Sequence, residues 1–254
     1  MIRAEILKIS KLKIVRLASI LSLVFLIIFF YQKAININSG YYERDLIYPM
    51  YISSFFLLSL DLVGGLYFII IGSSLVNIEY QSSTWGVMLN KQSKSKVIIS
   101  KVTTLMLICL CSVITVAILG FLLGGIYGRF FYNLDILLLV KQILTITIFS
   151  FIYGGLGIIL TMIMKNSAIA IILSFFIINF QSFIAQIIPF IKDVILTKYQ
   201  IGLIGNVFIN IINDQQLIVA MNDTPIITSV IGIICYTTIF IIIISVLIKK
   251  FQLE

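Results

Sequence analysis

Long stretches without a charged residue dominate the sequence and constrain the fold more than any other feature. Six runs are almost entirely apolar, and only Asp61 in the second and Lys141 in the fourth interrupt them: 17–32, 46–78, 102–128, 136–164, 166–191 and 224–248. A helix needs about 20 mostly apolar residues to cross the hydrocarbon core of a bilayer, where every backbone hydrogen bond must be made internally. The runs therefore predict an all-α, polytopic membrane protein with six transmembrane helices.

The composition supports lipid as the main solvent of this chain. Hydrophobic residues make up 61% and charged residues 11% of the 254 positions. Ordinary soluble domains have about 25% charged residues. No stretch has the composition of a linker or a soluble domain, so 1–254 is predicted to be a single transmembrane domain. The net charge of +8 does not indicate nucleic-acid binding, because the basic residues lie between the apolar runs.

Several kinds of active site are excluded by the residues that are absent. The chain has no histidine, which removes His-based metal sites and Ser–His or Cys–His catalysis. The three cysteines lie inside apolar runs and are predicted to be small core residues. No GxxxxGK[ST] loop occurs, so the chain is not expected to bind ATP by a P-loop. The glycines at 154, 155 and 157 are predicted to allow close helix packing instead.

Residues 1–14 mix apolar and basic side chains with a roughly helical period. This pattern predicts an amphipathic helix on the membrane surface, with a cleaved signal peptide over residues 1–35 as the alternative. Basic residues are enriched in cytoplasmic loops. If both termini are cytoplasmic, twelve of the 18 Lys and Arg residues lie inside and six lie outside. This excess of basic residues inside predicts that both termini are cytoplasmic.

The segment 192–223 lies between the last two apolar runs and has an unusual composition. It carries five charges, yet 200–213 has none and is rich in apolar residues. Fourteen residues are too few to span a bilayer. A re-entrant or interfacial segment on the outer side, between spans five and six, is therefore predicted.

The hydrophilic loop 79–101, between spans two and three, contains the most informative motif. Trp85, Met88 and Leu89 lie at positions i, i+3 and i+4, which places them on one face of a short helix. The loop resembles the first cytoplasmic loop of ABC-2-type transporter permeases, which has a glutamate after span two and a lysine at the start of span three. The positions that match this pattern are Glu79, Thr84, Lys94 and Lys101, whereas Ser83 and Gln92 replace the usual glycine and proline.

This resemblance, which also covers the order of helices along the chain, implies a non-catalytic membrane subunit of an exporter. It implies coupling to a separate cytosolic ATPase, in two copies, through Glu79, Thr84, Trp85, Met88, Leu89 and Lys94. ATP and Mg²⁺ are then expected on that partner, with no cofactor on this chain. A second permease, either the same chain or a homologue, is expected beside it in a bacterial cytoplasmic membrane. Bacitracin, lantibiotic-immunity and cytolytic-peptide exporters are the most similar subgroup; a hydrophobic drug or a lipid-linked molecule is the alternative cargo.

A substrate pathway is predicted from the polar residues within the spans. Asp61 is the sole acid within a span, and it either lines a pathway or is a structural residue paired with Lys141 or Arg129. The fifth span carries polar and aromatic residues that either hold cargo or bond neighbouring helices: Asn179, Ser182, Phe183 and Gln186. Helix packing is predicted at Gly64, Gly65, Gly120, Gly124 and Gly128.

Two other classes of function remain as alternatives. An intramembrane enzyme would need a catalytic constellation at membrane depth. An ion-coupled carrier or channel would need several ionisable groups there. Because Asp61 is the single buried acid expected, both are less favoured than a permease.

Overall fold

The computed structural model of the chain describes residues 2–38, 62–82, 93–128, 136–188, 195–207 and 225–250. These residues are helical apart from short turns, and no strand occurs among them, which confirms the predicted all-α class. The helices are α1 (Ile2–Lys11), α2 (Lys13–Asn38), α4 (Leu62–Gln81), α6 (Lys94–Gly128), α7 (Ile136–Met164), α8 (Ser167–Ile187), α9 (Leu196–Val207) and α11 (Ile226–Lys250).

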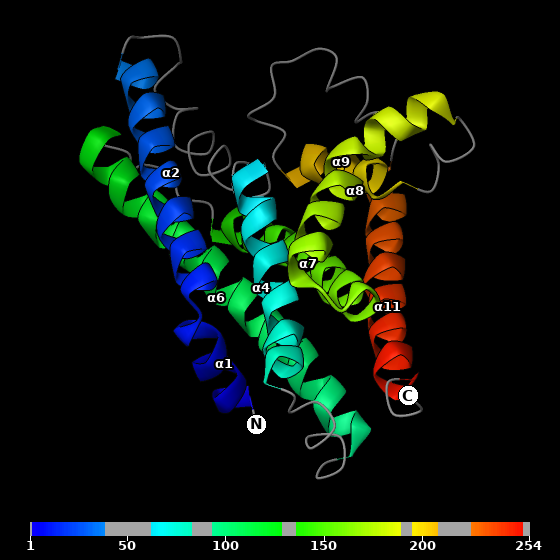
Figure 1. Cartoon of the computed structure of the whole chain (residues 1–254). Coiled ribbons are helices and arrows are strands. Elements are labelled where there is room, and N and C mark those ends of the chain that lie inside the picture. The colour runs from blue at the N-terminus through cyan, green and yellow to red at the C-terminus, as the bar shows by residue number, and fades with distance from the viewer. Residues whose placement is uncertain are drawn as a thin grey trace.

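The long helices form a bundle around α7. The start of α1 and the end of α11 lie at the same end of this bundle, as an even number of crossings requires (Figure 1). We call this the inner end, following the predicted orientation. Helix α9 lies near the opposite end, where it packs against α7, α8 and α11.

Three helices in the described part of the chain are long and apolar enough to cross a membrane. They cover Lys96–Gly120, Ile136–Met164 and Ile226–Ile248, at the places of the predicted spans three, four and six. Helices α2, α4 and α8 lie where spans one, two and five are predicted. The protein is therefore a multi-pass helical membrane protein, and the count of six remains a prediction.

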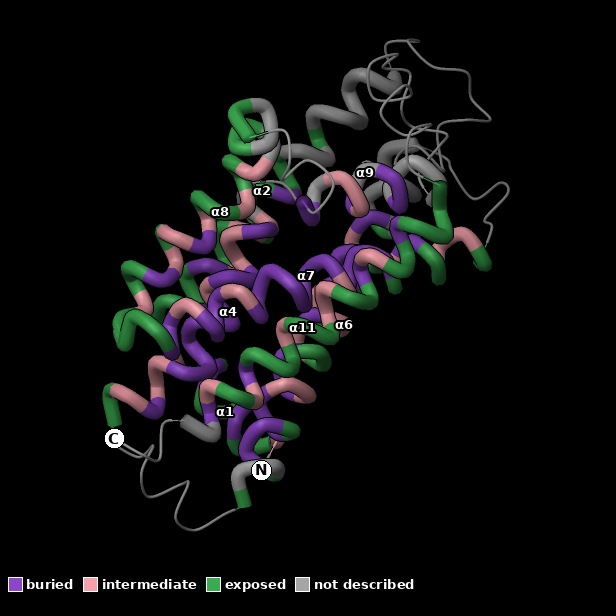
Figure 2. Tube along the Cα trace, turned by 90° about the vertical axis from the view of Figure 1, so that its right-hand side faces the viewer, coloured by how far each residue is buried: buried purple, intermediate pink, exposed green. Residues whose placement is uncertain are grey.

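The core of the bundle is the contact between α4 and α7, where glycines let two backbones touch. A Cβ atom on Gly72 would overlap with the backbone of Gly154, and one on Gly157 would lie 2.6 Å from the carbonyl oxygen of Ile69. The Ser73 hydroxyl donates to the Gly157 carbonyl oxygen at 3.3 Å. Figure 2 shows the buried residues concentrated on α4 and α7. The predicted packing role is confirmed for Gly154 and Gly157, whereas a Cβ on Gly155 would make only an ordinary contact with Phe240.

The three cysteines are free thiols, but they do not share one environment. Cys109 is fully buried, as predicted for a small core residue. Cys111 and Cys235 are exposed on the outer surface of the bundle, so the prediction of a core position is wrong for these two. An apolar run does not show which face of its helix meets lipid, and a thiol is apolar enough for either side.

Helix α9 partly fills the place predicted for the re-entrant segment, 192–223. Its Gln200 side chain donates a hydrogen bond to the Tyr153 hydroxyl of α7 at 3.0 Å, and both residues are buried. Its Tyr199 ring packs directly on Gly232 of α11. A helix in this segment is therefore present and bonded to the bundle. Its depth in the membrane, and residues 208–224, lie outside what the structure describes.

Candidate functional site

Helix α1 presents one face to the bundle at the inner end. Glu5 and Ile9, one turn apart, are both buried, whereas most of the helix is exposed. The helix stops before Leu12, and Arg16 of α2 closes the break: its Nε donates to the Ser10 carbonyl oxygen at 2.8 Å and its Nη2 to that of Lys11 at 3.2 Å. A cation at these unsatisfied carbonyl groups stabilises the C-terminus of α1.

Four charged side chains from three helices meet beneath this buried face. Lys8 and Glu5 come from α1, Glu79 from the last turns of α4, and Lys101 from α6. Nζ of Lys8 lies 2.9 Å from Oε1 of Glu79. Nζ of Lys101 lies 3.5 Å from Oε2 of Glu5 and 3.9 Å from Oε1 of Glu79. We call these four residues the charge cluster.

Lys101 is the centre of the charge cluster. Its side chain and that of Glu79 are 0% exposed. Besides its two carboxylate neighbours, its ammonium donates a hydrogen bond to the Leu75 carbonyl oxygen of α4 at 2.7 Å. Burying charges is tolerated only when they are paired and hydrogen-bonded. Two carboxylates and two ammonium groups give the cluster no formal net charge, and both ammonium groups donate hydrogen bonds, whereas the Glu5 Oε2 atom is paired with Lys101 by charge alone.

Lys8 is the member of the charge cluster that reaches solvent, with its side chain 43% exposed. Partial burial alone would lower the pKa of Lys8. The hydrogen bond and charge of Glu79, with the charge of Glu5, outweigh burial and hold the pKa of Lys8 above its ordinary value. At neutral pH, Lys8 is therefore charged, and its ion pair with Glu79 links α1 to the end of α4.

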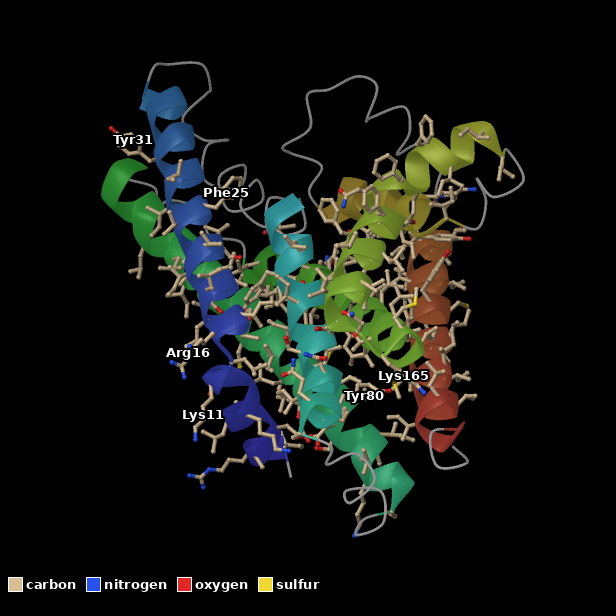
Figure 3. The ribbon with its side chains drawn as sticks, viewed as in Figure 1. Lys11, Arg16, Phe25, Tyr31, Tyr80 and Lys165 are labelled. Atoms are coloured by element: carbon tan, nitrogen blue, oxygen red, sulfur yellow. The ribbon has the colours of Figure 1, made fainter. Side chains whose placement is uncertain are left out.

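The charge cluster joins the two ends of the 79–101 loop. Glu79 lies where α4 ends, and Lys101 lies two turns into α6, which begins at Lys94. The last eight residues of the loop are thus the first turns of α6. At the same end, the Tyr80 hydroxyl donates to the Met162 carbonyl oxygen of α7 at 3.5 Å (Figure 3). The described ends of the loop are thus bonded to α1 and α7 as well as to α4 and α6.

The predicted coupling residues are only partly described. Glu79 belongs to the charge cluster. Lys94 is the first residue of α6. Thr84, Trp85, Met88 and Leu89 lie outside the described residues.

The predicted pathway residues on α8 share an exposed face as far as the structure describes them. Asn179 is exposed and its Nδ2 donates to the Phe175 carbonyl oxygen one turn earlier, at 2.9 Å. Phe176, Phe180 and Phe183 are exposed, and their rings follow one another with centroids 5.2 and 6.4 Å apart. Ser182 and Gln186 lie on the same helix, and Asp61 lies outside the described residues.

The predicted packing glycines have mixed surroundings. Gly65 and Gly120 are buried. Gly64 borders a cavity of about 150 Å³ between α2, α4 and α6. Gly124 and Gly128 lie in the last turns of α6. Tight helix contacts involve other glycines, at 72, 154, 157 and 232.

Sequence reasoning missed Glu5 and Lys8, which connect α1 to the site. A signal for Glu5 was present: it is the sole acid in residues 1–38, and it lies one turn before Ile9 on the apolar stripe of an amphipathic helix. An acid in that position needs a buried cation as partner. The sequence alone does not show which lysine supplies it.

Comparison with known proteins identifies the family but no individual relative. The family described as ABC-2 family transporter protein matches residues 1–181. No curated protein and no solved structure matches the chain. The match covers α1 to α7 and most of α8, and it includes all four residues of the charge cluster. The chain belongs to the ABC-2 transporter family and is a membrane permease component of an ABC transporter.

Proposed function

We propose that this permease exports amphipathic or antimicrobial peptides, out of the cell or out of the membrane, and that a separate ATPase docks beneath its 79–101 loop. The observation that carries the docking proposal is the charge cluster. Its buried ion pairs hold both ends of this loop to α1. A loop attached in this way passes a push from a cytosolic partner into the membrane as a rigid-body movement.

The loop has the composition of a docking element. Trp85, Met88 and Leu89 share one helical face, and Trp and Met are enriched at protein interfaces. Lys91, Lys94 and Lys96 follow this segment in the sequence, so the apolar face lies next to cations. In this proposal, Thr84 and Lys94 orient the apolar face of Trp85, Met88 and Leu89. Two ATPase subunits with ATP and Mg²⁺ act on a pair of permeases.

The cargo class rests on the exposed face of α8. Three neighbouring phenylalanine rings, at 176, 180 and 183, lie beside the exposed Asn179. A face with aromatic rings and an amide suits a molecule that is itself apolar on one side and polar on the other. We infer that two permeases face each other across α8, that Ser182 and Gln186 add to the polar side, and that Asp61 lies on the route near its outer end.

Site-directed photocrosslinking tests the docking proposal. A benzophenone amino acid replaces Trp85 in one variant and Lys165 in a control variant, which lies in another inner turn (Figure 3). In membranes from the native host, position 85 is expected to crosslink to a protein with a GxxxxGK[ST] loop, and position 165 is not. No such adduct at 85, or equal adducts at both positions, would remove the assignment.

The cargo is tested by survival of cells. The permease and the crosslinked ATPase are produced together in a sensitive bacterium, with an ATPase variant lacking its P-loop lysine as the control. A higher inhibitory concentration for bacitracin, a lantibiotic or a cytolytic peptide is expected only with the active ATPase. Protection restricted to small hydrophobic drugs would favour the alternative cargo, and no protection against either class would reject both.

A further inference from the structure

The outer face of α1 carries a regular stripe of cations and apolar side chains. Arg3, Leu7 and Lys11 follow one another at intervals of four residues, so they lie on one face of the helix. All three are exposed, and Leu7 is 51% exposed. The stripe lies opposite Glu5 and Ile9, which point into the bundle. Helix α1 therefore has one side for the charge cluster and another that no described part of the chain covers.

The stripe continues around the break into the first turn of α2. Lys13, Ile14 and Arg16 are exposed there. The hydrogen bonds of Arg16 to the carbonyl oxygens of Ser10 and Lys11 hold its guanidinium at the end of α1, next to the stripe. Figure 3 shows Lys11 and Arg16 at the inner end, on the side of α1 and α2 turned away from the bundle. We call Arg3, Leu7, Lys11, Lys13, Ile14 and Arg16 the elbow surface.

The elbow surface carries four positive charges that no nearby acid on these helices compensates. Glu5 is the sole acid among residues 1–38, and it is buried and paired with Lys101. Leu17, Ile20 and Leu21 continue the exposed apolar surface directly up α2, at 61%, 61% and 57% exposure. The cations thus lie where an apolar span begins.

We propose that the elbow surface is a binding site for the headgroups of anionic phospholipids of the inner leaflet. Lys and Arg near an anionic membrane surface each contribute about a five-fold gain in binding. Leu7 and Ile14, among the cations, match the boundary between headgroups and acyl chains. A nucleic acid would leave these apolar side chains in water, and the exposed apolar surface of Leu17, Ile20 and Leu21 continues directly from them up a membrane span, so the mixed surface favours lipid.

This site would link lipid composition to the charge cluster. Helix α1 is the element common to both, with Lys11 on its outer side and Glu5 on its inner side. A lipid that holds α1 against the bundle favours the Glu5–Lys101 and Lys8–Glu79 pairs. This lipid site belongs to the permease itself, and lipid binding there requires neither the cargo nor the ATPase.

Native mass spectrometry of the purified full-length chain in a neutral detergent tests the proposal. Phosphatidylglycerol and phosphatidylcholine are titrated separately, and the dissociation constant of the first bound lipid is measured. We expect phosphatidylglycerol to bind at least about 25-fold more tightly than phosphatidylcholine. The double variant Lys11→Gln, Lys13→Gln should lose about 25-fold in phosphatidylglycerol affinity, from two charges at about five-fold each. Lys11→Arg, Lys13→Arg should bind as the unmodified chain does.

A matched control separates position from total charge. Lys96→Gln, Lys165→Gln removes two exposed lysines at the same end of the bundle but outside the elbow surface, and should change the affinity less than three-fold. Arg16 is left intact because it also caps α1. Equal affinity for the two lipids would overturn the proposal. An equal loss in the elbow and control variants would show attraction by net charge alone and would overturn it too.

Discussion

The ammonium of Lys101 lies 3.5 Å from a carboxylate oxygen of Glu5 and donates a hydrogen bond to the Leu75 carbonyl oxygen at 2.7 Å. One fully buried cation thus holds the first helix, the end of α4 and the start of α6 together. Its methylene stem passes through the packed inner end of the bundle, where Val97 and Leu105 of its own helix are also buried. The arrangement leaves little room for water to replace a missing partner.

Lys101→Met should therefore destabilise the protein strongly. The substitution keeps an apolar side chain of similar length but leaves Glu5 and Glu79 buried without their common cation. Removing one partner of a buried ion pair costs about 3–5 kcal/mol. The measurement is reversible unfolding of the detergent-solubilised chain. Lys96→Met, an exposed lysine earlier on α6, should cost less than about 0.5 kcal/mol; equal losses would show that the buried pairs do not stabilise the fold.

The Lys8–Glu79 pair should not respond to pH near neutrality. Because the folded state raises the pKa of Lys8, its stabilisation is complete below the unfolded value and is lost as pH rises through the folded value. The stability difference between the unmodified chain and Lys8→Gln should stay constant from about pH 6 to 9, and shrink only above about pH 10.4. Unfolding of both proteins across this range checks it, with Lys11→Gln as a charge control. A difference that vanishes below pH 9 contradicts this prediction.

Gly72→Ala should impair folding although it adds one methyl group. The new Cβ would overlap with the backbone of Gly154, so α4 and α7 would have to separate along their main contact. Overpacking a core costs about 1–3 kcal/mol, and a backbone neighbour cannot rotate away. Gly155→Ala is the matched control, because its Cβ would lie 3.9 Å from Phe240, an ordinary contact. Folded yield and melting temperature should fall for Gly72→Ala alone.

The membrane class and part of the helix order follow from the sequence because the apolar runs are long. Lys96–Gly120, Ile136–Met164 and Ile226–Ile248 agree with predicted spans, since hydrocarbon thickness sets their length. The face that each span buries does not follow. Cys109 and Cys111 lie in one run, yet one is buried and the other is exposed. When lipid and core are equally apolar, hydrophobic periodicity no longer separates inside from outside.

The site was predictable in its chain positions but not in its connections. The loop motif identified Glu79 and Lys101 as the residues that flank the coupling segment. Their meeting in a charge cluster with Glu5 and Lys8 depends on how α1 packs across α4 and α6. That packing depends on tertiary contacts, which local sequence patterns do not predict.

Lys165→Gly should stabilise the turn between α7 and α8. Lys165 has a φ of 53°, in the left-handed region that costs a residue with a Cβ about 1 kcal/mol. The next residue, Asn166, caps α8 by accepting from the Ala168 and Ile169 amides at 2.9 and 3.4 Å, which fixes the turn. We expect a gain of about 0.5–1 kcal/mol in unfolding free energy. Lys165→Ala removes the same charge but keeps a Cβ; if it gains as much as glycine, backbone strain is not the cause.

Phe180 should lie at the contact between two permeases if α8 forms the shared face. In a chain lacking its three native cysteines, Phe180→Cys is expected to give a disulfide-linked dimer in membranes under mild oxidation. Phe180 is 45% exposed, and its ring lies between those of Phe176 and Phe183. If the α8 helices of two copies cross at residue 180, replacing the ring by the smaller thiol lets the two introduced cysteines approach to the short separation that a disulfide requires.

Leu144→Cys on α7 is the control for that crosslink, because Leu144 is 52% exposed on a different span. It should remain monomeric under the same oxidation. Dimers from Leu144→Cys in equal yield would mean random collision in the membrane. Absence of any dimer from Phe180→Cys, with the purified chain still migrating as two copies, would place the shared face elsewhere. The rings of Phe176, Phe180 and Phe183 would then face lipid, and the cargo proposal would lose its structural basis.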